Sequence, residues 1–148
     1  MNKEKLIEQL KYDEGVMHEI YNDHLGYPTF GVGHLVLKDD EEHGRPVGTP
    51  VSSERVDECL KRDIETCILE CGTLYGNRFY EWPDEVQQIL VNMMFNMGRP
   101  RLSKFKNMNK ALWARAWKRA AVEGRDSRWY KQVTQRAERL MKRLENVA

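Results

Sequence analysis

The sequence predicts an α+β fold that is mostly α-helical, with a small antiparallel β-hairpin near the N-terminus. Two observations predict this class. Apolar residues recur at intervals of three and four over long stretches, which is the period of an amphipathic helix. In contrast, two short runs rich in aromatic and β-branched residues flank a turn between His18 and Val36. At 148 residues, the chain is long enough for one domain with a core, divided over two lobes.

The first helix covers residues 2–13 and ends before Gly15, a residue suited to the left-handed conformation that follows many helices. Glu14 therefore stands at a helix C-terminus. The negative end of the helix dipole disfavours a carboxylate there, so we expect Glu14 to keep its proton. The apolar side of this helix is formed by Leu6, Ile7 and Leu10.

The hairpin consists of strands at 18–21 and 29–34 joined by a polar turn that contains Asp23. Alternation along the second strand predicts Thr29 and the two glycines of the strand on one face. Glycines there leave the face open to a sugar chain or to another backbone, and they also suit a bend in the strand. The next segment, 38–50, is a charged loop with Gly and Pro, and a third strand is expected to be short or absent.

A long helix begins at Ser52 or Ser53 and reaches about Cys71. Asp63 lies on its apolar stripe and therefore needs a partner, because an unpaired buried charge is costly. The next helix begins at Trp82-Pro83 and ends at Gly98, followed by one or two short helices over 100–125 and a basic C-terminal helix. The inward residues of that last helix are expected to be Leu140, Met141 and Leu144.

Composition and charge exclude few classes. Residues 1–74 hold 8 Lys and Arg against 16 Asp and Glu (−8), whereas residues 75–148 hold 16 against 7 (+9). The basic half could face an anionic polymer, or the two halves could neutralise each other within one fold. Cys59, Cys67 and Cys71 share one helix, and with no nearby His we expect small buried residues rather than a disulfide framework or a metal site.

Glu14 and Asp23, followed in the sequence by Thr29, are suited to glycoside hydrolysis. Breaking an acetal needs a protonated acid beside the leaving oxygen and a second, ionised carboxylate. We expect Asp23 to be ionised in its polar turn, so that the two environments assign the two roles. Thr29 has no visible base to make it a nucleophile, and holding a water near Asp23 is its simpler role.

The pattern Glu14-x8-Asp23-x5-Thr29, continuing as Phe30-Gly-Val-Gly-His-Leu35, resembles the phage-type lysozymes, the family of the T-even bacteriophage endolysin. The resemblance implies a mostly α two-lobed fold, with a β-lobe at about 13–55 and a helical lobe at about 56–148. A long helix joins the lobes, and helix 2–12 belongs to the helical lobe. It also implies that Glu14 is the proton donor, while Asp23 and Thr29 position and activate a water for inverting hydrolysis.

Further blocks, Asn92 to Gly98 and Ser127 to Arg139, extend this resemblance over most of the chain. It implies a His34–Asp63 ion pair, an approach of Arg136 to Glu14, and a pair between Arg139 and Asp13. The positions matching saccharide contacts in the family are Leu35, Phe95, Asn96, Met108 and Glu123. Met108 and Glu123 depart from the small polar residues of the family, so the resemblance does not fix subsite preference. As a lone feature, Phe95 would be assigned to the core.

The implied function is a peptidoglycan-degrading muramidase that cuts the β-1,4 bond between N-acetylmuramic acid and N-acetylglucosamine and lyses bacteria, without metal or cofactor. Inversion predicts carboxyl groups roughly 6.5–9.5 Å apart. The N-terminus lacks an apolar signal core, so we expect a protein made in the host cytoplasm that reaches the wall through a separate membrane-permeabilising protein or by delivery inside a phage particle. A monomer is the default expectation. The alternatives are a lysozyme-like domain that binds glycan without cutting it, and a helical nucleic-acid binder using the basic half.

Overall fold

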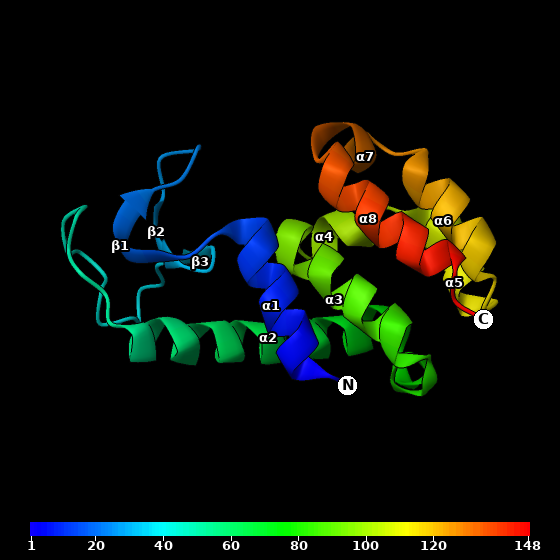
Figure 1. The fold of residues 1–148 in the computed structure, drawn as a ribbon, viewed down its shortest axis with the longest axis horizontal. Coiled ribbons are helices and arrows are strands. Elements are labelled where there is room, and N and C mark those ends of the chain that lie inside the picture. The colour runs from blue at the N-terminus through cyan, green and yellow to red at the C-terminus, as the bar shows by residue number, and fades with distance from the viewer. The chain divides into compact units, whose positions relative to one another are not determined.

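Eight α-helices and one three-stranded antiparallel sheet make up the computed structural model, which describes residues 1–148 (Figure 1). The predicted α+β, mostly α class is confirmed. Internal contacts divide the chain into an N-terminal unit, Lys3–Glu65, and a helical unit, Met1–Asn2 with Thr66–Ala148. This division groups the first helix with the sheet, whereas the sequence had assigned that helix to the helical lobe.

The N-terminal unit begins with α1 (Lys3–Glu14), which ends where the sequence predicts. Gly15 follows with a φ of 77°, and its N–H donates to the Lys11 carbonyl at 2.9 Å, closing the last turn. Leu6 and Leu10 are fully buried on one side of the helix. Glu14 is thus held at a rigid helix end, with its side chain half-buried.

The sheet has the order β1-β2-β3, with β1 at Met17–Asn22, β2 at Pro28–Gly31 and β3 at His34–Leu35. A tight turn joins β1 to β2 as predicted. The third strand, expected to be short or absent, is present with two residues. The loop that follows runs beyond the sheet and turns back to the start of α2 (Figure 1).

The prediction of one strand over 29–34 is wrong beyond Gly31. A turn follows, so Phe30 and His34 pair across a second hairpin, with ring centroids 4.9 Å apart. Gly31 and Gly33 have φ values of 64° and 60°, which favour glycine. They therefore do not form an open face with Thr29: they make this turn, and a Cβ built on either would crowd a neighbouring side chain.

Helix α2 (Ser53–Tyr75) begins at a cap that the sequence predicts and runs four residues past its predicted end. The Ser52 Oγ accepts from the Arg55 N–H at 3.1 Å, satisfying one of the donors that a helix start leaves unpaired. Cys59 and Cys71 are buried as predicted, while Cys67 is half-buried. The rest of the stripe in the N-terminal unit, Val56, Leu60 and Ile64, is buried too.

The helical unit contains the end of α2 and six further α-helices. Helix α3 lies between Pro83 and Gly98, as the sequence predicts, with its apolar side buried. The stretch 100–125 holds three short helices rather than one or two, because turns at Ser103 and Ala114 interrupt it. The bounds are η1 (Asn77–Glu81), α3 (Asp84–Met97), α4 (Arg99–Leu102), α5 (Lys106–Trp113), α6 (Trp117–Arg125), α7 (Arg128–Gln132) and α8 (Thr134–Glu145).

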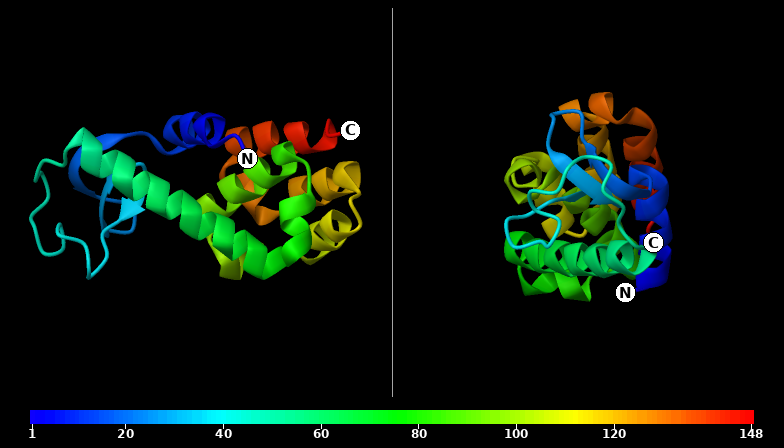
Figure 2. Two further views of the ribbon diagram at one scale, coloured as in Figure 1. Left: turned by 90° about the horizontal axis from the view of Figure 1, so that it is seen from below. Right: turned by 90° about the vertical axis from the view of Figure 1, so that its left-hand side faces the viewer.

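Within the helical unit, α8 packs along α6 and against α3, as the views in Figures 1 and 2 show. The Arg125 guanidinium joins α6 to α8 through Glu138 and Glu145, with N–O distances of 2.9 to 3.2 Å. The predicted inward residues of α8 are buried. No helix combines the length and the apolar character that crossing a bilayer requires.

The β2–β3 turn generates a test of the fold. Replacing Gly26 or Gly31 with Ala is expected to lower the free energy of unfolding by about 1–2 kcal/mol, because both residues have a positive φ. Only at Gly31 does the new Cβ also meet a buried group, the Val56 Cγ1 at 3.3 Å. Urea denaturation is expected to show Gly31→Ala as less stable than Gly26→Ala by roughly another 1 kcal/mol. Equal losses would contradict the close packing of this turn on α2.

Candidate active site

A row of three side chains crosses one face of the sheet. Tyr21 on β1 is the register partner of Thr29 on β2, and Thr29 is the partner of Leu35 on β3. Directly opposed residues project to the same face, so the three side chains lie side by side. Thr29 is buried at 4% exposure, whereas Leu35 is exposed at 47%. This face thus presents a hydroxyl pair beside an open apolar side chain.

Asp23 organises the turn at one end of this row. Its Oδ1 accepts from the backbone N–H groups of Leu25 and Tyr27, both at 2.9 Å. Its own N–H donates to the Tyr27 carbonyl at 2.9 Å. Such local bonds are why Asp is favoured in turns. Both side-chain bonds fall on Oδ1, so the second oxygen, Oδ2, is the one that can accept a hydrogen bond from a water.

The Thr29 hydroxyl donates to the same Tyr27 carbonyl, at 2.9 Å. Its proton is therefore committed to the turn, and the lone pairs of its oxygen are what it can offer to a water. Asp23 and Thr29 thus share one anchor, the backbone of Tyr27. Two side chains tied to one backbone unit keep a constant relative position.

Glu14 packs on the turn after β2. A Cβ placed on Gly33 would lie 2.9 Å from the Glu14 Oε1 and 3.4 Å from its Cδ. No ordinary side chain fits in that distance, so glycine lets the backbone approach the carboxyl group. The chain thus brings α1 and the second hairpin together at this carboxyl.

Tyr21 lies within the electrostatic reach of both carboxyl groups. Its pKa is raised above the usual value, first by burial and then by the charges of Glu14 and Asp23. Both acids therefore act on one phenol hydroxyl, which stays protonated and able to donate. The sequence analysis did not identify Tyr21. Its position two residues before Asp23 in a strand, and opposite Thr29 in the hairpin register, was the available signal.

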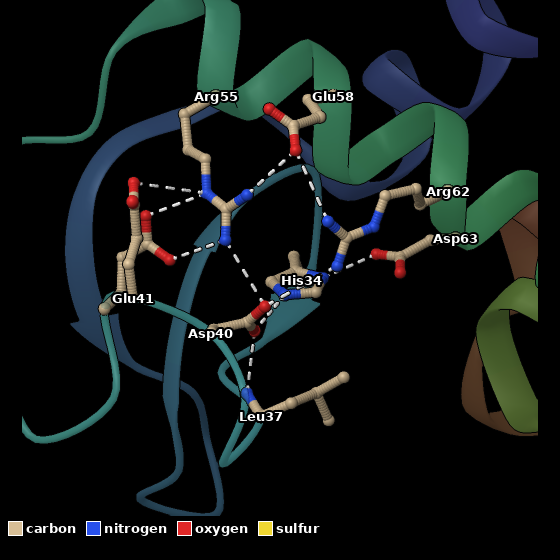
Figure 3. Close-up of polar contacts among 9 residues, drawn as sticks. His34, Leu37, Asp40, Glu41, Arg55, Glu58, Arg62 and Asp63 are labelled. Carbon is tan, nitrogen blue, oxygen red and sulfur yellow. Dashed lines mark hydrogen bonds and ion pairs between the residues drawn. The ribbon is translucent and has the colours of Figure 1, made fainter.

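His34 lies behind this face in a network of charged groups (Figure 3). The predicted contact is present: Nδ1 of His34 lies 2.7 Å from the Asp63 Oδ2. The other ring nitrogen, Nε2, lies 2.7 Å from the Asp40 Oδ2. Burial works to lower the pKa of His34, but its hydrogen bonds to the two carboxylates prevail and raise it.

The charged loop after β3 supplies Asp40 and Glu42, both buried. The Arg55 guanidinium binds Glu42 through two N–O contacts of 2.9 Å and reaches the Asp40 Oδ1 at 3.3 Å. Burial opposes ionisation of Asp40, but the Leu37 N–H, His34 and Arg55 outweigh it and lower its pKa. The sequence did not predict these contacts, because a polar loop indicates solvent exposure and gives no sign of its partner.

The remaining predicted contacts to saccharide lie in the helical unit. Asn96 is half-buried and accepts from the Trp129 Nε1 at 2.8 Å, next to half-buried Phe95. Met108 and Glu123 line a pocket of about 430 Å³ within this unit. Met108 is only 1% exposed, whereas Glu123 forms an ion pair with Arg119 at 2.6 Å.

The expected contacts of Arg136 with Glu14 and of Arg139 with Asp13 stay predictions. Arg136 is buried within the helical unit, where its Nε donates to the Asn92 Oδ1 at 2.9 Å. Arg139 is exposed on α8, and Asp13 is half-buried on α1. No group of three or more His, Cys, Asp or Glu side chains is arranged to hold a metal ion.

The family model for phage lysozyme matches residues 11–146. The chain belongs to the phage lysozyme family. The matched range contains Glu14, Asp23 and Thr29, together with the whole charged network around His34. Membership places this phage lysozyme among the glycoside hydrolases.

Individual relatives agree with the family. The phage lysozyme chain is 29% identical over 154 residues to the probable T4-type lysozyme 2 of Dictyostelium discoideum, covering 92% of this chain and 91% of that protein. It is 28% identical over 156 residues to the probable T4-type lysozyme 1 of the same organism, covering 93% and 92%. It is also 30% identical over 152 residues to the pre-baseplate central spike protein Gp5 of Enterobacteria phage T4, covering 91% of this chain. That match spans about a quarter (26%) of the spike protein.

The His34 network gives this phage lysozyme a pH-dependent stability. A pKa raised on folding contributes stability that is complete below the unfolded value, about 6.5, and is lost as pH rises through the folded value. We expect the urea midpoint of the wild type to fall as pH rises from 6 into the alkaline range. His34→Asn is expected to flatten this slope. A parallel slope in the variant would assign the pH dependence to other groups.

Proposed function

We propose that this phage lysozyme is a muramidase that hydrolyses the β-1,4 bond between N-acetylmuramic acid and N-acetylglucosamine in bacterial peptidoglycan, with inversion. The observation that carries the proposal is that the charges of Glu14 and Asp23 both act on the Tyr21 hydroxyl, whose pKa they raise, and that Tyr21 is the register partner of Thr29. Two carboxyl groups near one point are what acid-assisted hydrolysis of an acetal needs.

Glu14 is the general acid in this scheme and gives its proton to the leaving glycosidic oxygen. A water lies between Asp23 and Thr29, donating one hydrogen bond to the Asp23 Oδ2 and one to the Thr29 Oγ1. This leaves its lone pair to attack the anomeric carbon from the face opposite the leaving group, while Asp23 takes a proton. The bonds at the Asp23 Oδ1 and from the Thr29 hydroxyl to Tyr27 support these roles, because they hold both groups in position.

Substrate contacts extend the scheme. Leu35, exposed beside Thr29, offers an apolar surface to a sugar ring. Phe95, Asn96 and the pocket edge at Glu123 contact further saccharide from the helical unit, whereas Met108 contributes mainly by packing beneath the pocket. Arg136, Arg139 and Asp13 support the arrangement of the site.

The biological setting follows from the substrate. Peptidoglycan is the partner, and no nucleic acid is involved. The enzyme causes bacterial lysis as a monomer, as an endolysin does, and it reaches the wall through a separate membrane-permeabilising protein. It performs the reaction without a metal or an organic cofactor.

Glu14→Gln is expected to lower the rate of turbidity loss of permeabilised bacteria by at least roughly 100-fold, because the amide has no proton to give to the leaving oxygen. Glu8→Gln makes the same change at an exposed position on the same helix and is the matched control. Its rate is expected to equal that of the wild type.

Full lysis by Glu14→Gln would remove the general acid from the proposal. A wild type that retains peptidoglycan on a column but releases no reducing ends would instead be the glycan-binding alternative. Unfolding curves of both variants, taken in the same buffer, separate a loss of chemistry from a loss of fold.

Inversion has its own test. Proton NMR of a defined β-linked muropeptide oligomer, recorded in the first minutes of digestion, is expected to show the α-anomer of the new reducing end ahead of mutarotation. An initial β-anomer would indicate a retaining route, for which carboxyl groups only about 5 Å apart are typical. The lytic activity itself is compatible with either result, so this experiment tests the stereochemistry alone.

A further inference from the structure

The contacts of His34 require a doubly protonated ring. Each ring nitrogen lies 2.7 Å from a carboxylate oxygen, Asp63 on one side and Asp40 on the other. A neutral imidazole has one N–H, so its second nitrogen would turn a lone pair towards an acceptor that has only lone pairs. Both contacts are favourable only for the imidazolium, whose two N–H groups point in opposite directions.

The two carboxylates hold the ring to different parts of the N-terminal unit. Asp63 belongs to α2, whereas Asp40 belongs to the loop after β3 (Figure 3). Asp40 is fixed independently of the ring, since it accepts from the Leu37 N–H at 2.8 Å and from Arg55 at 3.3 Å. His34 is therefore held between two anchors and cannot pivot about a single contact.

Other charged groups surround these contacts. On α2, the Arg62 guanidinium lies 3.8 Å from the Asp40 Oδ1, and Glu58 pairs with both Arg62 and Arg55. On the loop, Glu42 binds Arg55 and Glu41 lies 3.7 Å from it. Acids outnumber bases here, so the positive charge of His34 is part of what keeps the cluster together.

The position of His34 is passed on to Glu14 through one residue. Gly33 directly precedes His34, and the Glu14 carboxyl group lies on the side of Gly33 where a side chain would otherwise stand. The partner of His34 across the hairpin is Phe30, so the turn between them is held at both ends. A shift of the His34 ring therefore shifts Gly33, against which the Glu14 carboxyl group packs. Misplacement of a catalytic group by about 1 Å can cost two orders of magnitude in rate.

We propose that Asp40 is a positioning residue for Glu14: it fixes the His34 imidazolium opposite Asp63, and so holds Gly33 against the carboxyl group of the general acid. The inference rests on the function proposed above and assigns a catalytic consequence to a loop residue that touches neither substrate nor reacting atoms. When His34 loses a proton, it can no longer donate to both carboxylates. The protonation of this ring therefore controls the position of the Glu14 carboxyl group.

The test compares Asp40→Asn with Asp39→Asn, which removes the same charge from the exposed neighbouring residue. Initial rates on peptidoglycan fragments are measured against substrate concentration from pH 5 to 9. Asp40→Asn is expected to lower kcat about 10-fold, with KM unchanged. The kcat–pH profile is expected to have an inflection at alkaline pH that coincides with the midpoint of the His34 ring titration. In Asp40→Asn both are expected to lie about one pH unit lower, because the imidazolium loses one of the two carboxylates that stabilise its positive charge. Asp39→Asn is expected to match the wild type.

A folded Asp40→Asn with the wild-type kcat and the wild-type alkaline inflection would overturn the proposal, as would a change confined to stability. NMR of the wild type gives an independent measurement that needs no lytic activity and no variant. The Gly33 amide and the Glu14 carboxyl carbon are expected to shift with the midpoint of the His34 ring. If the three signals do not share a midpoint, the positioning role of Asp40 and His34 is overturned. If they share a midpoint but the wild type does not lyse bacteria, only the muramidase function is overturned.

Discussion

Buried charge is the interaction on which the small sheet depends. Its strands have six, four and two residues, too few paired residues to be stable alone. The sheet is tied to α2 through His34 and Asp63, and the following loop is tied to the same helix through Arg55. Desolvation offsets much of the attraction in such pairs, so their main effect is to allow only one arrangement. A loop rich in acids thereby acquires a defined structure without an apolar core of its own.

The proposed site takes its three central side chains from three kinds of backbone, and local hydrogen bonds hold those of Asp23 and Thr29. Glu14 ends a helix, Asp23 caps a turn, and Thr29 is the second residue of a strand. These positions follow from short sequence signals, such as the glycine after the helix and the Asp at the start of the turn. For that reason the sequence predicted them well, and the family pattern added their roles. That Asp63 has a partner was predictable too, because an acid on an apolar stripe needs one, and the family resemblance identified that partner as His34.

What the sequence did not predict depends on distant partners or on conformation. The alternation of residues 29–34 fits a strand, yet positive φ values at two glycines make a turn, and nothing in the residue pattern distinguishes the two. Asp40 looked like a solvated loop residue because Arg55, which fixes it, lies fifteen residues away in sequence. Tyr21 was missed since its importance lies in which acids surround it. Local structure can be predicted from the sequence, whereas the electrostatic partners of residues distant in the sequence are known only from the three-dimensional structure.

The cysteines of α2 have a practical consequence. Burial raises the pKa of the Cys59 thiol to about 11 and that of Cys71 further still, so neither ionises readily at neutral pH. The thiolate is the form that attacks disulfides and maleimides. Cys67, half-buried between them, is then where such reagents react first. The native chain thus offers a site for a spectroscopic label in the middle of its longest helix, without any engineered residue.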